Sequence, residues 1–358
     1  MPGMGVARRV LACPLQTPAM TETLTSVPRR SWLRLIAVSL LAFIVLLTTA
    51  GVLYENISEA RDRRFNPMQG KLFDVDGRKM HIDCTGGGSP KGGPTFILDA
   101  GLGDSYLSWR KVQPQIAKFA RVCSYDRAGI GYSESSSQQR TSRVIAEELH
   151  ALLQAAGIAP PYILVGHSMG GYDVRLYASL YRSGVAGMVL VDASHPDQDE
   201  RLPPELKKMD GTWLRESEFI EYTMSFGVPR LLGLCDNDAE QRAAECNFQT
   251  ARESVKEIES FPLSAAETAA TGALGDIPLA VLSHDPNKPL ADIPADLAKP
   301  TNDAWEKMQE ELAHLSTRGT QTIARNSSHY IQIDRPDVVI EAVHTVLELA
   351  SAPIPLAK

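Results

Sequence analysis

Tyr162-Ile163-Leu164-Val165-Gly166-His167-Ser168-Met169-Gly170-Gly171 joins a short apolar run to a Gly-x-Ser-x-Gly pattern. This order predicts a buried strand that turns sharply into a helix, because glycine at 166 and 170 removes the Cβ atoms that would clash in a tight turn. The turn lifts Ser168 above the sheet edge, and the backbone N–H of Met169 lies behind it, where a helix N-terminus stabilises negative charge. The alternative interpretation is a glycine-rich turn in which the serine has no role. The five-residue pattern by itself allows this interpretation, but the strand before the turn and the helical pattern after it disfavour it. We therefore expect Ser168 to be a nucleophile.

Outside this stretch, strand-like runs alternate with helical patterns. The runs are residues 79–83, 95–99, 122–125, 162–165, 187–191, 279–282 and 321–324. Ile145, Leu149 and Leu152 form one helical face between two of the runs, with Thr141 as the expected N-cap. This alternation predicts an α/β protein with a mostly parallel sheet and helices on both faces. Residues 196–276 interrupt the alternation with helical stretches and no strand pattern.

Three further segments, like the turn at Ser168, resemble motifs of the α/β-hydrolase family. The motifs occur along the chain in the same order as in that family. Residues 95–103 (TFILDAGLG) are similar to its third strand and oxyanion loop, although Ala100 stands where histidine is common. Residues 126–133 (DRAGIGYS) resemble the turn after its fourth strand, and residues 328–336 resemble the loop of its catalytic histidine. The resemblance covers about residues 71–350. It implies that residues 196–276 form a helical lid, which shapes the pocket and excludes water.

His329 is the general base that this resemblance implies. A serine hydroxyl is a weak nucleophile until an imidazole accepts its proton. His195, which follows the run at 187–191, is the second choice. The acid that orients the base is either Asp192, at the end of that same run, or Asp285, after the run at 279–282. Register and triad geometry favour Asp192, but both carboxylates remain open.

The backbone N–H groups of Leu102 and Met169 are the expected donors to an oxyanion. Dehalogenases and epoxide hydrolases resemble this fold but carry aspartate at the position of Ser168. The resemblance therefore implies a serine hydrolase that cleaves an ester, thioester or amide through an acyl-enzyme. The alternative is a non-catalytic scaffold of the same fold that acts as a membrane-tethered binding module. The presence of both Ser168 and His329 favours the enzyme.

A charge-free run from Leu35 to Tyr54 predicts a single transmembrane helix over residues 32–54. Its twenty residues span about 30 Å as a helix, which is the thickness of a bilayer core. Trp32 and Tyr54 bracket the run as interfacial anchors would. A cleaved signal peptide is the alternative, since residues 48–50 form a tolerable cleavage site. Three arginines lie on each side, and the nearer, acid-free N-terminal set favours an extracytoplasmic catalytic domain.

The composition is that of an ordinary globular protein, with 44% hydrophobic and 22% charged residues. The net charge of −7 argues against nucleic acid as a partner, because phosphate binding needs a basic face. Cys84 and Cys123 are predicted to be buried thiols, whereas for Cys235 and Cys246 pairing is left open if they face an oxidising compartment. The cysteine and histidine spacings do not match a metal site, so no bound metal is expected. The sequence has no nucleotide-binding loop pattern, so no cofactor is expected. The expected partners are a small-molecule or lipid-like acyl substrate and the membrane, and the oligomeric state stays open.

Five aromatic and sulfur-containing side chains of the expected lid have two interpretations: they line an apolar pocket, or they pack the lid onto the core. They are Trp213, Phe219, Tyr222, Met224 and Phe226. The predicted organisation is an N-terminal disordered segment 1–31, a transmembrane helix 32–54, a linker 55–70, a core formed by 71–195 and 277–350, a lid 196–276 and a tail 351–358.

Overall fold

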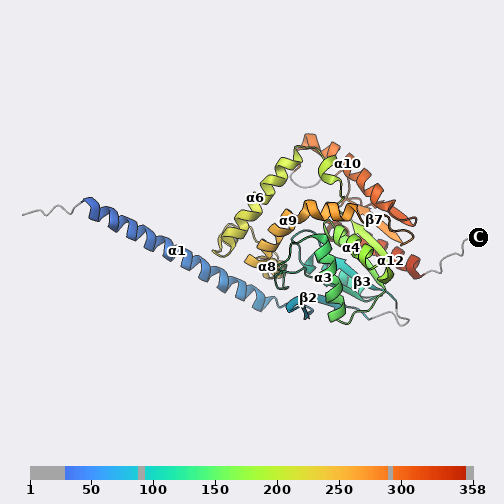
Figure 1. Ribbon diagram of the computed structural model, residues 1–358, viewed down its shortest axis with the longest axis horizontal. Coiled ribbons are helices and arrows are strands. Elements are labelled where there is room, and N and C mark those ends of the chain that lie inside the picture. The colour runs from blue at the N-terminus through green and yellow to red at the C-terminus, as the bar shows by residue number, and fades with distance from the viewer. Residues whose placement is uncertain (1–28, 88–92, 289–292, 352–358) are drawn as a thin grey trace, which may run out of the picture. The chain divides into compact units, whose positions relative to one another are not determined.

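The computed structural model describes residues 29–87, 93–288 and 293–351 (Figure 1). The predicted segments 1–31 and 351–358 lie almost wholly outside these residues, and so does Cys13. The chain divides into two compact units, residues 1–48 and 49–358.

Helix α1 (Arg29–Phe65) runs through both units. Its residues 32–48 are exposed, and it is long and apolar enough to cross a membrane, with a mean hydropathy of 2.6 in its most apolar window. The segment 55–70, predicted as a linker, is helical up to Phe65. Residues 55–65 contain neither glycine nor proline, and Glu59 pairs with Arg63 one turn later at 3.2 Å, so the helix continues until Pro67 approaches.

The second unit is built on one eight-stranded sheet in the order β1-β2-β4-β3-β5-β6-β7-β8. The strands are β1 Lys71–Val75, β2 Arg78–Thr85, β3 Thr95–Asp99, β4 Val122–Tyr125, β5 Tyr162–His167, β6 Val185–Val191, β7 Leu279–Ser283 and β8 Gly319–Ile323. From β4 to β8 all neighbours are parallel, which confirms the predicted sheet. β2 is antiparallel to both β1 and β4.

Strand β1 was not predicted. It forms a hairpin with β2 through Asp76-Gly77, both of which have positive φ angles of 51° and 80°. An Asp-Gly pair with two positive φ angles is a favoured two-residue hairpin turn, because its twist matches that of the flanking strands.

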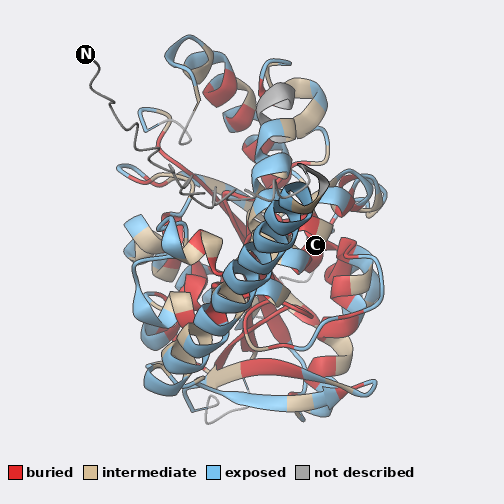
Figure 2. Cartoon of the chain, turned by 90° about the vertical axis from the view of Figure 1, so that its left-hand side faces the viewer, coloured by how far each residue is buried: buried red, intermediate tan, exposed pale blue. Residues whose placement is uncertain are grey.

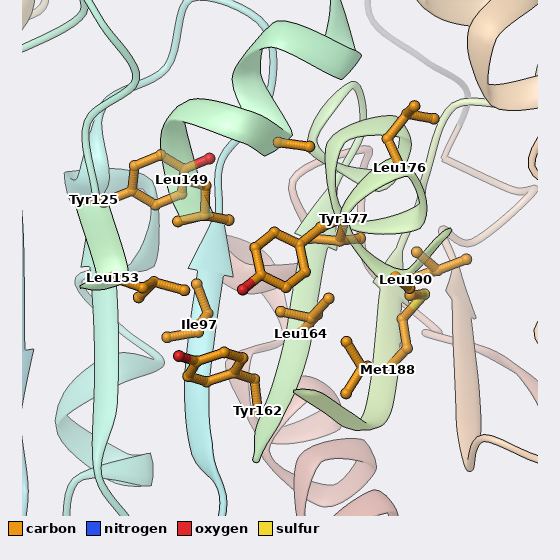
Figure 3. Close-up of a cluster of buried hydrophobic side chains, with 14 of the residues drawn as sticks. Ile97, Tyr125, Leu149, Leu153, Tyr162, Leu164, Leu176, Tyr177, Met188 and Leu190 are labelled. Carbon is orange, nitrogen blue, oxygen red and sulfur yellow. The ribbon is translucent and has the colours of Figure 1, made fainter. Parts of the chain in front are cut away.

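Helices cover both faces of the sheet, as the alternation of patterns predicts. On one face, α3 (Ser142–Ala155) and α4 (Gly170–Leu180) bury a cluster that includes Ile97, Leu164 and Met188 (Figure 3). On the other face, α2 (Gln113–Ile116) and α12 (Pro336–Ser351) cover the alternate residues of the same strands. The strands are mostly buried in consequence (Figure 2). Thr141 caps α3 as predicted, accepting a hydrogen bond from Val144 N–H.

The segment between β6 and β7 is helical, as its pattern predicts. Its helices are α5 Gln198–Arg201, α6 Leu206–Met224, α7 Val228–Leu231, α8 Ala239–Glu245 and α9 Phe248–Ala269. A further helix, α10 (Ala295–Ala313), lies between β7 and β8. The remaining elements are short: η1 Tyr106–Trp109, η2 Arg182–Gly184 and α11 Ile331–Asp334.

Four of the cysteines form two disulfides, Cys84–Cys123 and Cys235–Cys246. The first corrects the prediction of buried thiols. Cys84 in β2 and Cys123 in β4 are direct partners across an antiparallel ladder, with Cα atoms 4.1 Å apart, and at that distance their sulfur atoms can bond. The second is the pairing that the sequence leaves open for an oxidising compartment.

Candidate active site

The turn from β5 into α4 has the shape that its sequence predicts. Ser168 adopts a φ of 52°, a left-handed conformation that is rare for a residue with a side chain and typical of a nucleophile elbow. A Cβ atom at Gly166 would lie 2.4 Å from the carbonyl oxygen of Gly170, and one at Gly170 would lie 2.6 Å from that of Ala100. Neither position accepts a side chain, so both glycines are needed for the turn to pass under the loop that follows β3.

His329 lines the same pocket as Ser168 and contacts a buried carboxylate. Its Nδ1 atom is 2.7 Å from Oδ2 of Asp192, whose side chain is fully buried. Asp192 follows β6 directly and has a positive φ of 44°. The imidazole of His329 is partly exposed, at 24% of its side-chain surface, and both His329 and Ser168 line the pocket.

Two other side chains also donate to Asp192. Nδ1 of His284 lies 2.9 Å from Oδ2, and Nε1 of Trp305 lies 2.9 Å from Oδ1. Burial alone raises the pKa of Asp192, but the charge and hydrogen bonds of His284 and His329 outweigh it, and the pKa falls below its usual range. For His284 burial has the opposite effect and lowers the pKa of the imidazole. The charge of Asp192 outweighs burial, so the net shift of the His284 pKa is upward. Asp192 is therefore held as a carboxylate.

Asp285, the other predicted acid, bonds elsewhere. Its Oδ2 accepts from the backbone N–H of Asn326 at 2.8 Å, and its Oδ1 accepts from that of Asn287 at 3.0 Å. These backbone hydrogen bonds, that from Asn326 first, lower the pKa of Asp285 to about 2. The side chain fixes the chain before the loop of His329. His195, the second choice as base, has its Nδ1 beside Asp197 N–H at 3.1 Å and its Nε2 beside Glu311 at 3.5 Å.

His167, the residue before Ser168, points away from the pocket. Its Nε2 lies 3.1 Å from the carbonyl oxygen of His329, so it donates there and ties the elbow to the histidine loop. Burial, and then the charge of His329, lower the pKa of His167 to about 3, so it is neutral. A Cβ atom at Gly101 would meet His167 Nδ1 at 2.9 Å. This ring therefore lies against the loop that follows β3.

The two predicted oxyanion donors are the N–H of Leu102, in the loop after β3, and that of Met169, the residue after Ser168. Within the described part of the chain, neither N–H donates to a protein acceptor. Leu102 lines the pocket together with Ser168.

Arg127 and Glu257 hold the loop that carries Leu102. The buried guanidinium of Arg127 donates to the carbonyl oxygens of Ala100 at 2.8 Å and Gly101 at 2.6 Å. Glu257, from helix α9, accepts from Arg127 Nε at 2.7 Å and from the backbone N–H of Gly103 at 2.9 Å. The loop lacks the family's common histidine at position 100, and these two charged residues fix its backbone from both sides.

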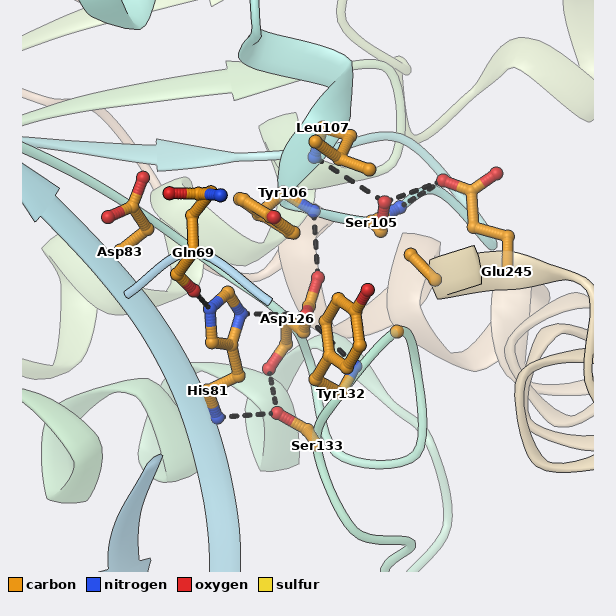
Figure 4. A network of polar contacts seen from close by, with 12 residues as sticks. Gln69, His81, Asp83, Ser105, Tyr106, Leu107, Asp126, Tyr132, Ser133 and Glu245 are labelled. Carbon is orange, nitrogen blue, oxygen red and sulfur yellow. Dashed lines mark hydrogen bonds and ion pairs between the residues drawn. The ribbon is translucent and has the colours of Figure 1, made fainter. Parts of the chain in front are cut away.

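A second network orders the chain just beyond this loop (Figure 4). Asp126 accepts from His81 Nδ1 at 2.7 Å and from the backbone N–H of Tyr106 at 2.8 Å. Glu245 of helix α8 accepts from both the N–H and the hydroxyl of Ser105, at 3.1 and 2.6 Å. Burial lowers the pKa of His81, but the charge of Asp126 outweighs it and the net shift is upward. Burial raises the pKa of Glu245 to about 7.

The pocket beside Ser168 has a volume of about 320 Å³ and mainly apolar walls. Its lining residues are Leu102, Ser168, Ser194, Gln198, Asp199, Leu202, Trp213, Ile258, Phe261, Pro262, Trp305 and His329. Of the five lid side chains for which the sequence allowed a pocket-lining role, Trp213 lines this pocket. Among residues 29–87, 93–288 and 293–351, no three His, Cys, Asp or Glu side chains are grouped so as to hold a metal ion.

Three residues of this site escaped the sequence analysis: His284, Trp305 and Glu257. For His284 a signal existed. Val191 and Leu282 are register partners in parallel strands. Asp192 follows Val191 and His284 lies two residues after Leu282, so both lie at the same sheet edge. Trp305 and Glu257 come from helices whose position depends on tertiary packing.

Comparison with known proteins agrees with this architecture. Residues 94–277 match the family model of the alpha/beta hydrolase fold. An uncharacterised protein of Bacillus subtilis, YqjL, is 28% identical over 77% of this chain and 91% of its own. An AB hydrolase superfamily protein of Gibberella zeae is 22% identical over 72% of this chain and 87% of its own. The structure of a thermophilic esterase from Thermogutta terrifontis covers 80% of this chain and 100% of its own, with a TM-score of 0.55 and 18% identity.

The family resemblance found in the sequence is thus confirmed for the fold, and it supports a hydrolytic role. The family model covers just over half of the chain, from before β3 to before β7. By this match and by its sheet, the chain belongs to the alpha/beta hydrolase fold family.

Proposed function

We propose that this protein is a membrane-anchored serine hydrolase that cleaves an ester, thioester or amide bond through an acyl-enzyme on Ser168. The observation that carries the proposal is the 2.7 Å contact between His329 Nδ1 and Asp192, at a pocket that the strained Ser168 also lines. An oriented imidazole beside a serine in an elbow is the arrangement that makes a hydroxyl nucleophilic.

In the first half of the reaction, Ser168 Oγ attacks the carbonyl carbon while Nε2 of His329 accepts the hydroxyl proton. Asp192 accepts the Nδ1–H bond, which fixes the tautomer of His329 and stabilises the imidazolium. The N–H groups of Leu102 and Met169 stabilise the oxyanion. The imidazolium then protonates the leaving group. In the second half, His329 takes a proton from water, the hydroxide oxygen attacks the acyl carbon, and Ser168 recovers its proton as the acid product leaves. The reaction uses only water and the chain's own groups.

Helix α1 is the proposed anchor, inserted through residues 32–54 with the sheet on the extracytoplasmic side. The two disulfides support this orientation, because disulfides persist in oxidising compartments and are rare in the cytosol. The apolar pocket walls support a neutral, acyl-bearing substrate.

Turnover of a panel of p-nitrophenyl acyl esters of increasing chain length tests the reaction. The parent chain is expected to hydrolyse at least one of them, and Ser168→Ala to reduce that rate to the background. Undiminished turnover by Ser168→Ala would refute the assignment of the nucleophile. A folded parent chain that hydrolyses none, with esters, thioesters and amides all tried, would favour the scaffold alternative.

A further inference from the structure

An exposed apolar edge lies on the helical insertion, at helices α6 and α7 and the turns that follow them. We define the α6–α7 edge as Phe219, Tyr222, Phe226, Leu231, Leu232 and Leu234. Tyr222 is 71% exposed and Leu231 68%, so these side chains are not part of the core. Exposed apolar side chains gathered on two helices that contact each other mark an interaction site in a soluble domain.

Helix α6 separates two kinds of contact. Ile220 and Met224, one turn apart, line a depression beside α9, and Met224 is buried. Phe219 and Tyr222, three residues apart, lie on a different face at 100° per residue, and both are exposed. The inward face of α6 thus accounts for its packing, and the aromatic side chains of its outward face are exposed.

The same edge is fastened to the membrane-proximal part of α1. A Cβ atom at Gly51 would lie 2.5 Å from the carbonyl oxygen of Phe226, and one at Gly227 would lie 2.7 Å from the ring of Tyr54. Just beyond, Arg230 of α7 donates through two nitrogens to the buried carboxylate of Glu55, each at 3.1 Å. Close packing and a bidentate ion pair fix α7 against residues 51–55 of α1.

We propose that the α6–α7 edge docks into the bilayer leaflet from which the anchor helix emerges, which rests on the anchor assigned in the proposed function. The proposed span ends at Tyr54, and Tyr54 itself contacts the turn before α7. Exposed leucines held at that level meet lipid rather than water. Burial of apolar side chains at the headgroup boundary is the mode by which interfacial segments bind membranes.

The charged residues next to the α6–α7 edge indicate which lipid headgroups it would bind. The residues that follow Leu234 include Asp236, Asp238 and Glu240, all exposed. Anionic headgroups would repel these carboxylates, so the docking is apolar and is expected to occur on zwitterionic phosphatidylcholine and to persist in high salt.

The test places a tryptophan on the edge of the full-length chain in phosphatidylcholine vesicles. Leu231→Trp and Leu232→Trp are made in a Trp32→Phe background, and the added emission is compared in ordinary lipid and in lipid brominated on the upper acyl carbons. Leu72→Trp is the matched control, an exposed leucine in β1 on the sheet. Most of the added emission is expected to be quenched by bromolipid for both edge variants, at low and high salt, and none for the control.

Extraction of the same vesicles with carbonate separates the two proposals. A chain that stays in the vesicles, with edge tryptophans no more quenched than Leu72→Trp, would overturn the docking surface and leave the anchor standing. A chain released by carbonate would overturn the anchor and the docking surface together. Ester turnover by the edge variants reports that they are folded, and quenching itself needs no catalysis.

Discussion

The Nδ1 atom of His329 lies 2.7 Å from Oδ2 of Asp192, although 137 residues separate the two in the chain. Asp192 directly follows parallel β6, and the loop after β8 brings His329 back to the same edge of the sheet. In open α/β sheets, ligands bind at the carboxyl edge of the strands, where residues from several strands meet.

Asparagine at position 192 should lower kcat by about three to four orders of magnitude with the fold intact, because an amide can hold His329 in the wrong tautomer. Asparagine at position 285 is the matched control. The Asp285 carboxylate of the parent chain accepts hydrogen bonds from the backbone of Asn287 and Asn326. Its loss should therefore lower the thermal midpoint, while kcat should stay within about an order of magnitude. Ester turnover and thermal unfolding of both variants measure this. Loss of kcat in Asp285→Asn with normal kcat in Asp192→Asn would reverse the assignment.

Glutamine at position 257 should weaken the oxyanion loop. The amide of glutamine keeps one acceptor oxygen, and its nitrogen accepts no hydrogen bond, so the contacts with Arg127 and with Gly103 N–H cannot all be kept. The N–H of Leu102 then loses its fixed direction. We expect kcat to fall by about 10- to 100-fold, less than for removal of a donor, with KM changed little. Glu259→Gln, an exposed change of equal charge on the same helix, is the control. Equal kcat in both variants, measured below their thermal midpoints, would mean that Glu257 does not position the loop.

The stability that depends on Glu245 should fall as the pH rises from about 4.5 to about 7, and the raised pKa of His81 extends the fall above 6.5. The pKa of His81 is raised by Asp126, and burial raises that of Glu245 to about 7. A group with a raised pKa contributes stability below its unfolded pKa, and this stability is lost as the pH passes the folded value. Thermal midpoints across this range measure the effect. Glu245→Gln mimics the protonated acid and should flatten the profile, whereas an unchanged profile in this variant would exclude Glu245 as a contributor.

The disulfides predict the number of free thiols. Of the five cysteines, only Cys13 is outside the two bonded pairs, so alkylation of the unfolded, unreduced chain should modify that residue alone. After reduction, all five should react. Mass spectrometry of the intact chain measures this. Loss of the Cys84–Cys123 bond, as in a double serine variant, should lower the unfolding free energy by about 2–4 kcal/mol. Five reactive thiols before reduction would remove the support for an extracytoplasmic domain.

Sequence patterns predicted the parts of this fold that repeat locally. The strand-turn-helix at Ser168, the parallel strands and the cap at Thr141 follow from apolar runs, from glycines at fixed offsets and from a capping side chain before a helical pattern. Strand β1 had a local signal as well, since Asp76-Gly77 is a hairpin turn, but its residues 71–75 alternate too weakly in polarity to be recognised as a strand.

Features that depend on register or helix packing were not predictable in the same way. Asp192 and Asp285 both follow strands that end at one edge, and only the direction of each side chain separates the one that contacts His329 from the one that fixes a turn. The pairing of Cys84 with Cys123 needed the β2–β4 register. Trp305 comes from a helix whose sequence carries no sign of its distant partner, Asp192.

Covalent labelling by a fluorophosphonate is the most direct test of the central claim, that Ser168 is an activated nucleophile. The probe phosphonylates a serine only where a base activates it, and peptide mass spectrometry then locates the modified residue. Ser168→Ala removes the proposed nucleophile, and Ser194→Ala removes a second hydroxyl that lines the same pocket. We predict label on Ser168 in the parent chain and in Ser194→Ala, and none in Ser168→Ala. Label that persists in Ser168→Ala, or a folded parent chain that takes up none, would contradict the account.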